Sequence, residues 1–387
     1  MKHLLTFAVA AGIATGACAQ GVEQGAKNAP QFTPAFPNQT RAPAMDSGVA
    51  MQIDVLAEGL ETPWGVEVLP EGGYLVTERS GALRMVKDGK VSAPISGVPQ
   101  VLAERQGGLL DVALAEDFAT SRVIFLTYAK PMQGGMSGTA AARAVLSADG
   151  RALTNLRDVF VQDPPSANAM HFGSRAVLQG DTLYITTGEH FSTRERKFSQ
   201  DLDKTYGKVV RVNLDGGAAK GNPFYNEIWT LGHRNVQGAD IRPSDGTLWT
   251  LEHGAAGGDE LNKITAGANY GWPVVSYGVN YNGSPIGSGQ ARQEGFAEPQ
   301  YYWDPVIAPG GFAFYQGTMF DGWEGNILAA SLNPGGLVRL VLDGDRVVGE
   351  ERFLSGEIRV RDVEIDRDGA ILILDNSDGR LLRLTPK

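Results

Sequence analysis

Cysteine and histidine are scarce in this sequence, which has 1 cysteine and 5 histidines among its 387 residues. The cysteine, Cys18, lies in an N-terminal apolar segment, so the chain that follows it contains no thiol. Disulfide frameworks and cysteine-based zinc sites are therefore excluded from that part of the chain. The fold has to be stabilised by a buried apolar core.

Long apolar runs and long basic runs are also absent after residue 20. A membrane-spanning helix needs about 18 consecutive apolar residues, and no stretch approaches that length. With a net charge of −10, the chain is not expected to bind nucleic acid or an anionic membrane. The sequence also lacks a G-x-S-x-G motif, a Walker loop and a well-placed G-x-G-x-x-G, so serine hydrolase and nucleotide-cofactor functions are not expected.

Residues 1–19 predict a secretory signal peptide. Lys2 precedes an apolar run that ends in the small-x-small sequence A-C-A. Cleavage there gives a mature chain that begins near Gln20, and the protein is expected to be periplasmic or secreted. A lipoprotein acylated at Cys18 is the alternative, which Thr15 disfavours because an aliphatic residue is expected at its position.

The segment after the signal peptide, residues 20–48, is rich in proline, alanine and polar residues and has neither helical nor alternating periodicity. This composition predicts a mobile leader. We expect one folded domain over residues 49–387.

Within that domain the chain repeats one unit, in which a short apolar strand, a turn and a second strand follow each other, often ending at an acidic residue. The clearest copies begin at Trp64, Arg175, Ala239 and Arg361, and weaker copies begin at Asp111 and Gly311. The spacing is roughly 50 to 70 residues. Asp-Gly pairs, which favour tight hairpin turns, recur along the chain, and long amphipathic helical patterns are absent.

These repeats predict an all-β fold, a six-bladed β-propeller of four-stranded antiparallel blades, whose circular closure protects the sheet edges. An irregular β-sandwich or barrel is the alternative. In a propeller the loops at one end of the central channel converge from every blade, so residues that are distant in sequence can share one pocket.

A candidate acid–base pair is formed by His171 and Glu189. His171 precedes one predicted strand and Glu189 ends the next, so a hairpin can bring them together. The carboxylate would then orient the imidazole for proton abstraction. A loop histidine that is hydrogen-bonded to backbone is the structural alternative.

Other polar clusters favour the binding of a small anionic or oxygen-rich molecule. Arg234 and Asn235, in HRNVQG, combine a fixed cation with an amide, although a buried structural arginine fits nearly as well. Arg359 and Arg361 alternate along a predicted strand and would point to one face, where they would suit a multiply anionic ligand; a solvated surface pair is the alternative. Gln106 precedes two glycines that let a ligand approach the backbone.

The stretch EHGAAGGDELN, residues 252–262, joins glycines to adjacent acids and is followed by NYGWP. Oxygen-rich loops of this kind suit calcium, and an acidic turn without metal is the alternative.

In combination and in order, these stretches resemble the soluble, pyrroloquinoline quinone (PQQ)-dependent glucose/sorbosone dehydrogenase family, in particular its periplasmic aldose sugar dehydrogenases. The resemblance extends from TPWGVEVLPEGGYLVTERSGALR through ERQGGLLDVAL, HFGSR, GHRNVQG and EHGAAGGDELN to IRVRDV and DGRLLRL. It implies a six-bladed propeller that carries PQQ over its central channel.

The resemblance also implies roles for individual residues. His171 would be the general base, oriented by Glu189, that removes the proton from the anomeric hydroxyl of the sugar. The expected PQQ contacts are Gln106, Arg234, Asn235, Tyr281, Arg359 and Arg361. The carbonyls of Gly254 and Ala255 would bind the Ca²⁺ that activates the quinone, and a second, structural Ca²⁺ would match Glu260 and Tyr270.

One departure from the family pattern lies in SLNPGGLVRL, where Asn333 stands at the position of a usual lysine. An amide can still hydrogen-bond the cofactor, but it loses charge assistance worth about 1 to 2 kcal/mol. Weaker PQQ binding, or a changed ligand, is the expected consequence.

The resulting hypothesis is an exported PQQ- and Ca²⁺-dependent dehydrogenase that oxidises aldoses to lactones and passes electrons to a soluble acceptor. A calcium-dependent propeller lactonase and a non-catalytic propeller that binds sugar or protein are the alternatives.

Overall fold

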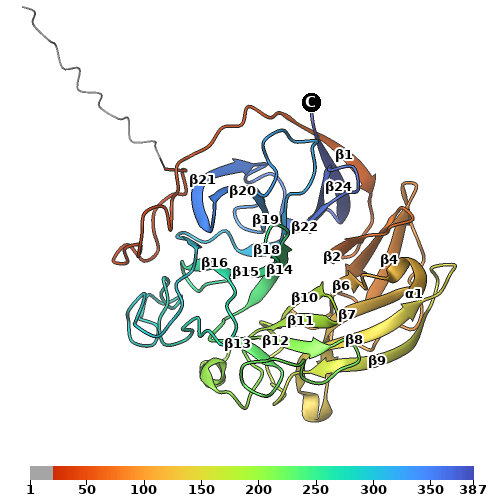
Figure 1. The fold of residues 1–387 in the computed structure, drawn as a ribbon, viewed down its shortest axis with the longest axis horizontal. Helices are drawn as coiled ribbons and strands as arrows, with labels where there is room; N and C mark the ends of the chain where they lie inside the picture. Colours follow the sequence, from red (N-terminus) through yellow and green to blue (C-terminus); the bar gives the residue numbers. More distant parts are fainter. Residues whose placement is uncertain (1–20) are drawn as a thin grey trace, which may run out of the picture.

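The computed structural model describes residues 21–387, so the predicted signal peptide and Cys18 lie outside the described residues. Six four-stranded antiparallel sheets are arranged around a central axis, as Figure 1 shows. The prediction of a six-bladed β-propeller is confirmed. Within residues 21–387, no helix is long and apolar enough to cross a membrane.

Each blade runs outward from the axis. The first contains β2 (Pro63–Val68), β3 (Tyr74–Glu78), β4 (Ala82–Lys87) and β5 (Lys90–Val91). The second contains β6 (Leu109–Leu114), β7 (Val123–Pro131), β8 (Ser137–Leu146) and β9 (Leu153–Val161). The third contains β10 (Gly173–Gln179), β11 (Thr182–Thr187), β12 (Lys208–Asn213) and β13 (Ile228–Leu231).

The other three blades follow the same pattern. The fourth contains β14 (Val236–Arg242), β15 (Thr247–Glu252), β16 (Asp259–Lys263) and β17 (Tyr301–Trp303). The fifth contains β18 (Pro309–Phe314), β19 (Ile327–Ser331), β20 (Gly336–Asp343) and β21 (Arg346–Phe353). The sixth contains β22 (Val360–Ile365), β23 (Ile371–Asp375), β24 (Arg380–Pro386) and β1 (Met51–Ala57). Short helices, α1 (Phe118–Ser121), η1 (Gln133–Gly135) and η2 (Arg196–Gln200), lie in connecting loops.

Every repeat seen in the sequence forms the two inner strands of a blade. The copies that begin at Trp64 and Arg175, for example, become β2–β3 and β10–β11. Apolar residues from facing blades interdigitate: Leu75 and Leu83 of the first blade share one buried cluster with Leu126 of the second. The core is therefore a ring of sheet-to-sheet interfaces, which explains how the fold is stabilised without disulfides in the described residues.

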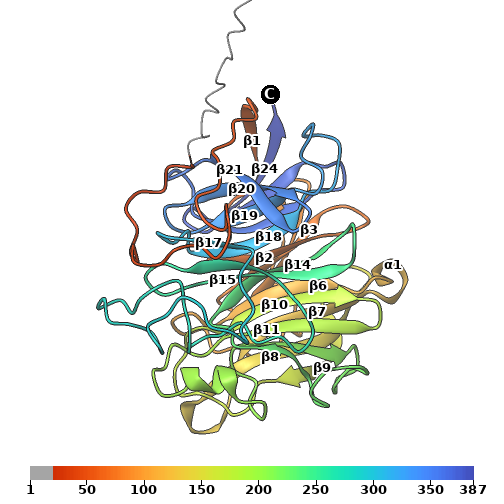
Figure 2. The same ribbon diagram turned by 60° about the vertical axis from the view of Figure 1, so that its left-hand side comes forward.

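The ring is closed by the two ends of the folded domain. β1 pairs antiparallel with β24, in a register that sets Met51 opposite Pro386. Figure 2 shows these two strands side by side near the C-terminus. The outermost strand of the sixth blade thus comes from the opposite end of the chain from its other three strands.

The prediction of a mobile leader is wrong for residues 21–48, which lie against the propeller (red to orange in Figure 1). Gln39 and Ala42 are fully buried, and the Asp304 carboxylate accepts hydrogen bonds from the backbone N–H groups of Asn28 (2.6 Å) and Ala29 (2.9 Å). The Gln39 amide donates to the carbonyl of Pro299 at 2.9 Å. Polar composition misled the prediction because these groups find partners on the blades rather than in water.

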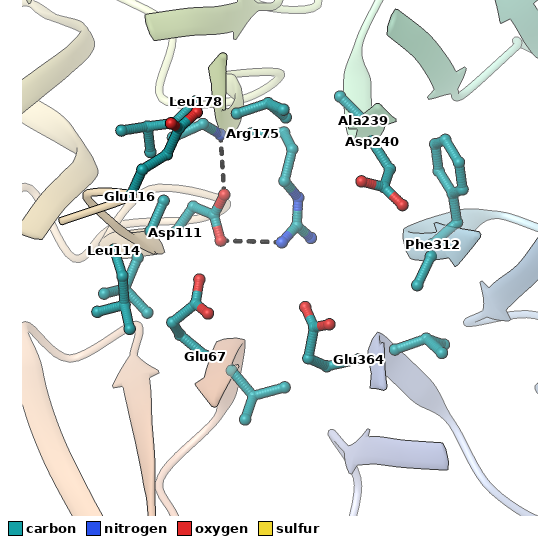
Figure 3. A pocket seen from close by; sticks show the side chains of 17 residues that line it. Glu67, Asp111, Leu114, Glu116, Arg175, Leu178, Ala239, Asp240, Phe312 and Glu364 are labelled. Carbon is teal, nitrogen blue, oxygen red and sulfur yellow. Dashed lines mark hydrogen bonds and ion pairs between the residues drawn. The ribbon is translucent and has the colours of Figure 1, made fainter. Parts of the chain in front are cut away.

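The inner strands surround a central cavity of about 280 Å³ that is rich in carboxyl groups. Figure 3 shows Glu67, Asp111, Asp240 and Glu364 around it, with Arg175 reaching across from β10. Burial, and then the charge of the neighbouring Asp111, raises the pKa of Glu67 to about 8. Burial likewise raises the pKa of Asp111 to about 7 and that of Asp240 to about 6.

These raised pKa values predict that the protein loses stability as pH rises. A carboxyl whose pKa is higher in the folded state favours folding fully below its unfolded pKa, near 4.5 for glutamate, and this contribution is lost as pH rises through the folded value, about 8 for Glu67. Each proton lost in this window lowers the free energy of unfolding by about 1.4 kcal/mol per pH unit. Glutamine is neutral at every pH, so the free energy of unfolding of Glu67→Gln, measured with urea, should fall less between pH 5.5 and 8.5 than that of the wild type. The exposed control Glu294→Gln should follow the wild type, and equal slopes for all three proteins would contradict the prediction.

Candidate active site

His171 and Glu189 are brought together by the β10–β11 hairpin, because His171 precedes β10 and Glu189 follows β11. His171 Nδ1 lies 2.7 Å from Glu189 Oε1, and both side chains are buried. The Gln106 side-chain oxygen accepts a hydrogen bond from the His171 backbone N–H at 2.8 Å, so three of the predicted residues form one contact network.

The electrostatic environment keeps this imidazole neutral. Burial, and then the charge of Arg234, holds the pKa of His171 well below its usual 6.5. Burial raises the pKa of Glu189 to about 7. With the Nδ1 proton directed at Glu189, the lone pair at Nε2 can accept a proton, as a general base requires.

Arg234 and Asn235 lie in the turn between β13 and β14. Arg234 Nη1 donates to the carbonyl of His253 at 3.0 Å, and its guanidinium carbon lies 5.3 Å from the centre of the Trp272 ring. Asn235 Oδ1 accepts a hydrogen bond from the backbone N–H of Gly173 at 3.0 Å, which fixes this turn beside the His171 strand.

The histidine that opens the HRNVQG motif has a structural environment. His233 Nδ1 lies 2.9 Å from Glu252 Oε1, its Nε2 lies 2.9 Å from Thr230 Oγ1, and its ring stacks on Tyr270. Glu252 also accepts from the Arg234 backbone N–H at 2.7 Å. His233 therefore positions the turn that carries Arg234.

Arg359 and Arg361 form the other cationic part of the site. Arg361 Nη1 donates to Gln237 Oε1 at 2.8 Å, and the same oxygen lies 3.0 Å from His253 Nε2. Burial, followed by the charges of Arg359 and Arg79, lowers the pKa of Arg361 to about 9. Two neighbouring cations that repel each other are well suited to an anion with several charges.

The position of Asn333 is next to this pair. It lies exposed in the turn between β19 and β20, and the carbonyl of the preceding Leu332 accepts a hydrogen bond from Arg359 Nη1 at 2.8 Å. Arg359 itself precedes β22 and is exposed, whereas Arg361 is partly buried on the strand.

A cavity of about 420 Å³ adjoins the His171–Glu189 pair. Glu189, Arg234, Ala255 and Tyr281 line it, together with residues that the sequence prediction missed: Phe191, Ser192, Thr193, Arg196, Trp272, Asn280, Asn282 and Ser284. The Phe191 ring lies 4.9 Å from the His171 ring and 6.0 Å from the ring of Tyr281, which is 67% exposed. Phe191 thus contacts the ring of the base, and both aromatic residues are exposed to solvent.

Three of the predicted calcium positions, Gly254, Ala255 and Glu260, lie on the β15–β16 hairpin, and Tyr270 lies in the loop that follows β16. Gly254 and Ala255 are buried in the turn of the hairpin. Glu260 is paired directly with Glu252 across the two strands, and burial, then the Glu252 charge, raises the pKa of Glu260 well above its usual value. A small cavity of about 20 Å³ lies between these carboxyl groups and Tyr270.

The hydroxyl of Tyr270 donates to the carbonyl of Lys263 at 2.7 Å, so only its backbone carbonyl is free to serve a metal. Among residues 21–387, no three side chains of histidine, cysteine, aspartate or glutamate gather as a metal-binding group.

A family profile described as "Glucose / Sorbosone dehydrogenase" matches residues 60–383, nearly the whole propeller. The chain belongs to this glucose/sorbosone dehydrogenase family. The resemblance inferred from the sequence motifs is thereby confirmed.

Members of the family are similar to this chain over most of their length. It is 40% identical to the aldose sugar dehydrogenase YliI of Escherichia coli K12, covering 87% of this chain and 93% of that protein. The crystal structure of the soluble aldose sugar dehydrogenase of E. coli in the apo form superposes with a TM-score of 0.83 at 39% identity, covering 87% of this chain and all of that one. The PQQ-bound aldose sugar dehydrogenase of Streptomyces coelicolor gives a TM-score of 0.73 at 28% identity, and the match covers 88% of this chain and 99% of that one.

Proposed function

We propose that this protein is an exported quinoprotein dehydrogenase that oxidises aldose sugars to lactones, using PQQ and Ca²⁺. The observation that carries the proposal is the buried His171–Glu189 pair at the edge of a cavity that Arg234 also lines. The names of the relatives support the substrate class, since all three named above are called aldose sugar dehydrogenases.

The residues around the site fit a polyanionic quinone. Arg234 Nε, Arg361 Nε and Glu189 Oε2 are buried and have no hydrogen-bond partner within residues 21–387. Buried polar atoms of this kind are costly unless a ligand or water satisfies them. Arg359 and Arg361 would bind carboxylates of PQQ, and Arg234 and Asn235 would bind quinone oxygens, with Gln106, Tyr281 and Asn333 as further contacts.

Calcium fits the glycine-rich turn because carbonyl and carboxylate oxygens are the ligands that it prefers. The carbonyls of Gly254 and Ala255 would hold the Ca²⁺ next to the cofactor. Glu260 and the carbonyl of Tyr270 would hold a second, structural Ca²⁺, which would also relieve the repulsion between Glu252 and Glu260.

The cofactor and its Ca²⁺ supply, when bound, a two-electron acceptor polarised by a Lewis acid. The protein moves the proton: His171 Nε2 takes it from the C1 hydroxyl of the sugar, while the hydrogen on C1 leaves with its electron pair as hydride. A C1=O double bond forms, and the cyclic sugar becomes a lactone. Glu189 holds Nδ1–H and stabilises the imidazolium, and Phe191 and Tyr281 limit water at the base. Electrons would then pass to a soluble acceptor.

Reconstitution tests this function. The mature protein is titrated with PQQ in 1:1 steps in the presence of CaCl₂, and an aldose and an artificial dye are then added. We expect saturable PQQ binding, sugar-dependent bleaching of the quinone absorbance and dye reduction, all lost when EGTA removes Ca²⁺ before PQQ is added. Absence of PQQ binding would contradict the proposal. Calcium-dependent hydrolysis of lactones without PQQ would favour the lactonase alternative instead.

A further inference from the structure

Arg196 is a cation in the cavity that lies near Glu189 without forming an ion pair with it. It begins η2, in the loop between β11 and β12, and lines the cavity together with Glu189 and Arg234. Its Nη1 donates to the side-chain oxygen of Asn280 at 3.1 Å, and its guanidinium carbon lies 5.7 Å from the centre of the Trp272 ring. Within residues 21–387 it forms no ion pair with a carboxylate.

The charges that line this cavity do not balance. The two guanidinium groups face one carboxyl group, Glu189, which is bonded to His171 and whose pKa burial raises to about 7. The other lining residues are neutral, with hydroxyl and amide groups from Ser192, Asn280 and Ser284. Arg234 is expected to bind the quinone of PQQ, so Arg196 is the cation of this lining to which no ligand has been assigned.

Arg196 is not among the cations expected to hold the cofactor, although Arg234, which is expected to bind quinone oxygens, lines the same cavity. Arg359 and Arg361 lie at β22 and contact Leu332 and Gln237, and neither lines this cavity. Arg196 shares the lining of this cavity with Phe191 and Tyr281, two aromatic residues that are exposed to solvent. A sugar that presents C1 to His171 would extend its other end toward these loops.

We propose that Arg196 binds a carboxylate on the substrate, so that the preferred aldoses are uronic acids, which carry a carboxylate at the end opposite C1. This inference rests on the proposed function. The planar guanidinium suits a carboxylate because it can donate two parallel hydrogen bonds, and Asn280 and Trp272 hold it in place. The reaction at C1 is unchanged: hydride and proton leave as before, and the product is the lactone of a dicarboxylic acid.

The test compares kcat/KM for galacturonate and galactose in the PQQ- and Ca²⁺-loaded protein. Arg196→Gln should lower the value for galacturonate by about 10- to 100-fold, the range for one charge-assisted pair, and that for galactose by less than about 3-fold. Arg196→Lys keeps the charge but loses the planar guanidinium, so its kcat/KM for galacturonate should lie between those of the wild type and Arg196→Gln. Arg194→Gln, an exposed arginine of the same loop, is the matched control and should leave both values unchanged.

The outcomes separate this inference from the proposed function. An unchanged ratio of the two kcat/KM values in Arg196→Gln would overturn the inference while the dehydrogenase stands. A weaker Kd for PQQ, with equal losses for both sugars, would assign the bound carboxylate to the cofactor and also overturn it. If the wild type oxidises no sugar, the proposed function fails, and calorimetric binding of galacturonate that Arg196→Gln abolishes would still support the site. Loss of folding in Arg196→Gln would leave Arg196→Lys to decide.

Discussion

Replacing His171 by alanine is expected to lower kcat for aldose oxidation by about 10²- to 10⁴-fold, the usual contribution of a positioned general base. PQQ should stay bound, because the residues expected to hold it are left in place. The reason is geometric: Nδ1 is held by Glu189 at 2.7 Å, and the neutral ring leaves Nε2 able to accept a proton.

Rapid-reaction measurements of quinone bleaching check this expectation, with PQQ binding measured on the same sample. Glu189→Gln, which keeps the shape but loses the charge that stabilises the imidazolium, should cause a smaller loss. Substantial dehydrogenase activity in His171→Ala would remove His171 from the catalytic role. Since the pKa of His171 is held well below 6.5, kcat should not fall between pH 8 and pH 6.5 through protonation of this residue.

Replacing Arg175 by methionine is expected to lower the free energy of unfolding at pH 8 by about 3 to 5 kcal/mol, as is usual when a buried ion pair loses one partner. Arg175 donates to Asp111 at 2.8 Å and to Asp362 at 2.9 Å, and all three side chains are buried. Its guanidinium carbon also lies 4.7 Å from the Trp64 ring centre. Methionine fills similar space but leaves two carboxylates without their cation.

Urea unfolding at two pH values measures this effect. The loss should be smaller at pH 5.5 than at pH 8, because burial already raises the pKa of Asp111 to about 7 and protonation removes the uncompensated charge. Arg367→Met is the surface control, since that exposed side chain only donates to the carbonyl of Pro70. A loss below 1 kcal/mol at pH 8 would show that the Asp111–Arg175–Asp362 cluster does not stabilise the propeller.

The sequence predicted the parts of this structure that are formed by residues close to one another in the chain. Alternating strands and Asp-Gly turns mark each blade, and one hairpin joins His171 to Glu189, so both could be predicted from neighbouring residues. The central carboxyl cluster could not, because Glu67, Asp111 and Glu364 come from different blades and meet only when the ring closes. Gln237 had a weak local signal, since it lies on β14 only two residues after Asn235.

Arg196 had no such signal, because the loop that carries it meets the rest of the cavity lining only in the folded structure. The prediction of a mobile leader failed for a related reason. The hydrogen-bond partners of the leader, such as Asp304 and Glu350, are more than 200 residues away, and composition alone cannot reveal them.

The pairing of β1 with β24 also governs when this molecule can become a propeller during its synthesis. The last blade is incomplete until β24 has been synthesised, and contacts between segments as distant as β1 and β24 form slowly. For the export that we propose, this delay would favour translocation of the chain before the propeller has folded. The same β1–β24 pairing then protects both ends of the folded domain from local unfolding.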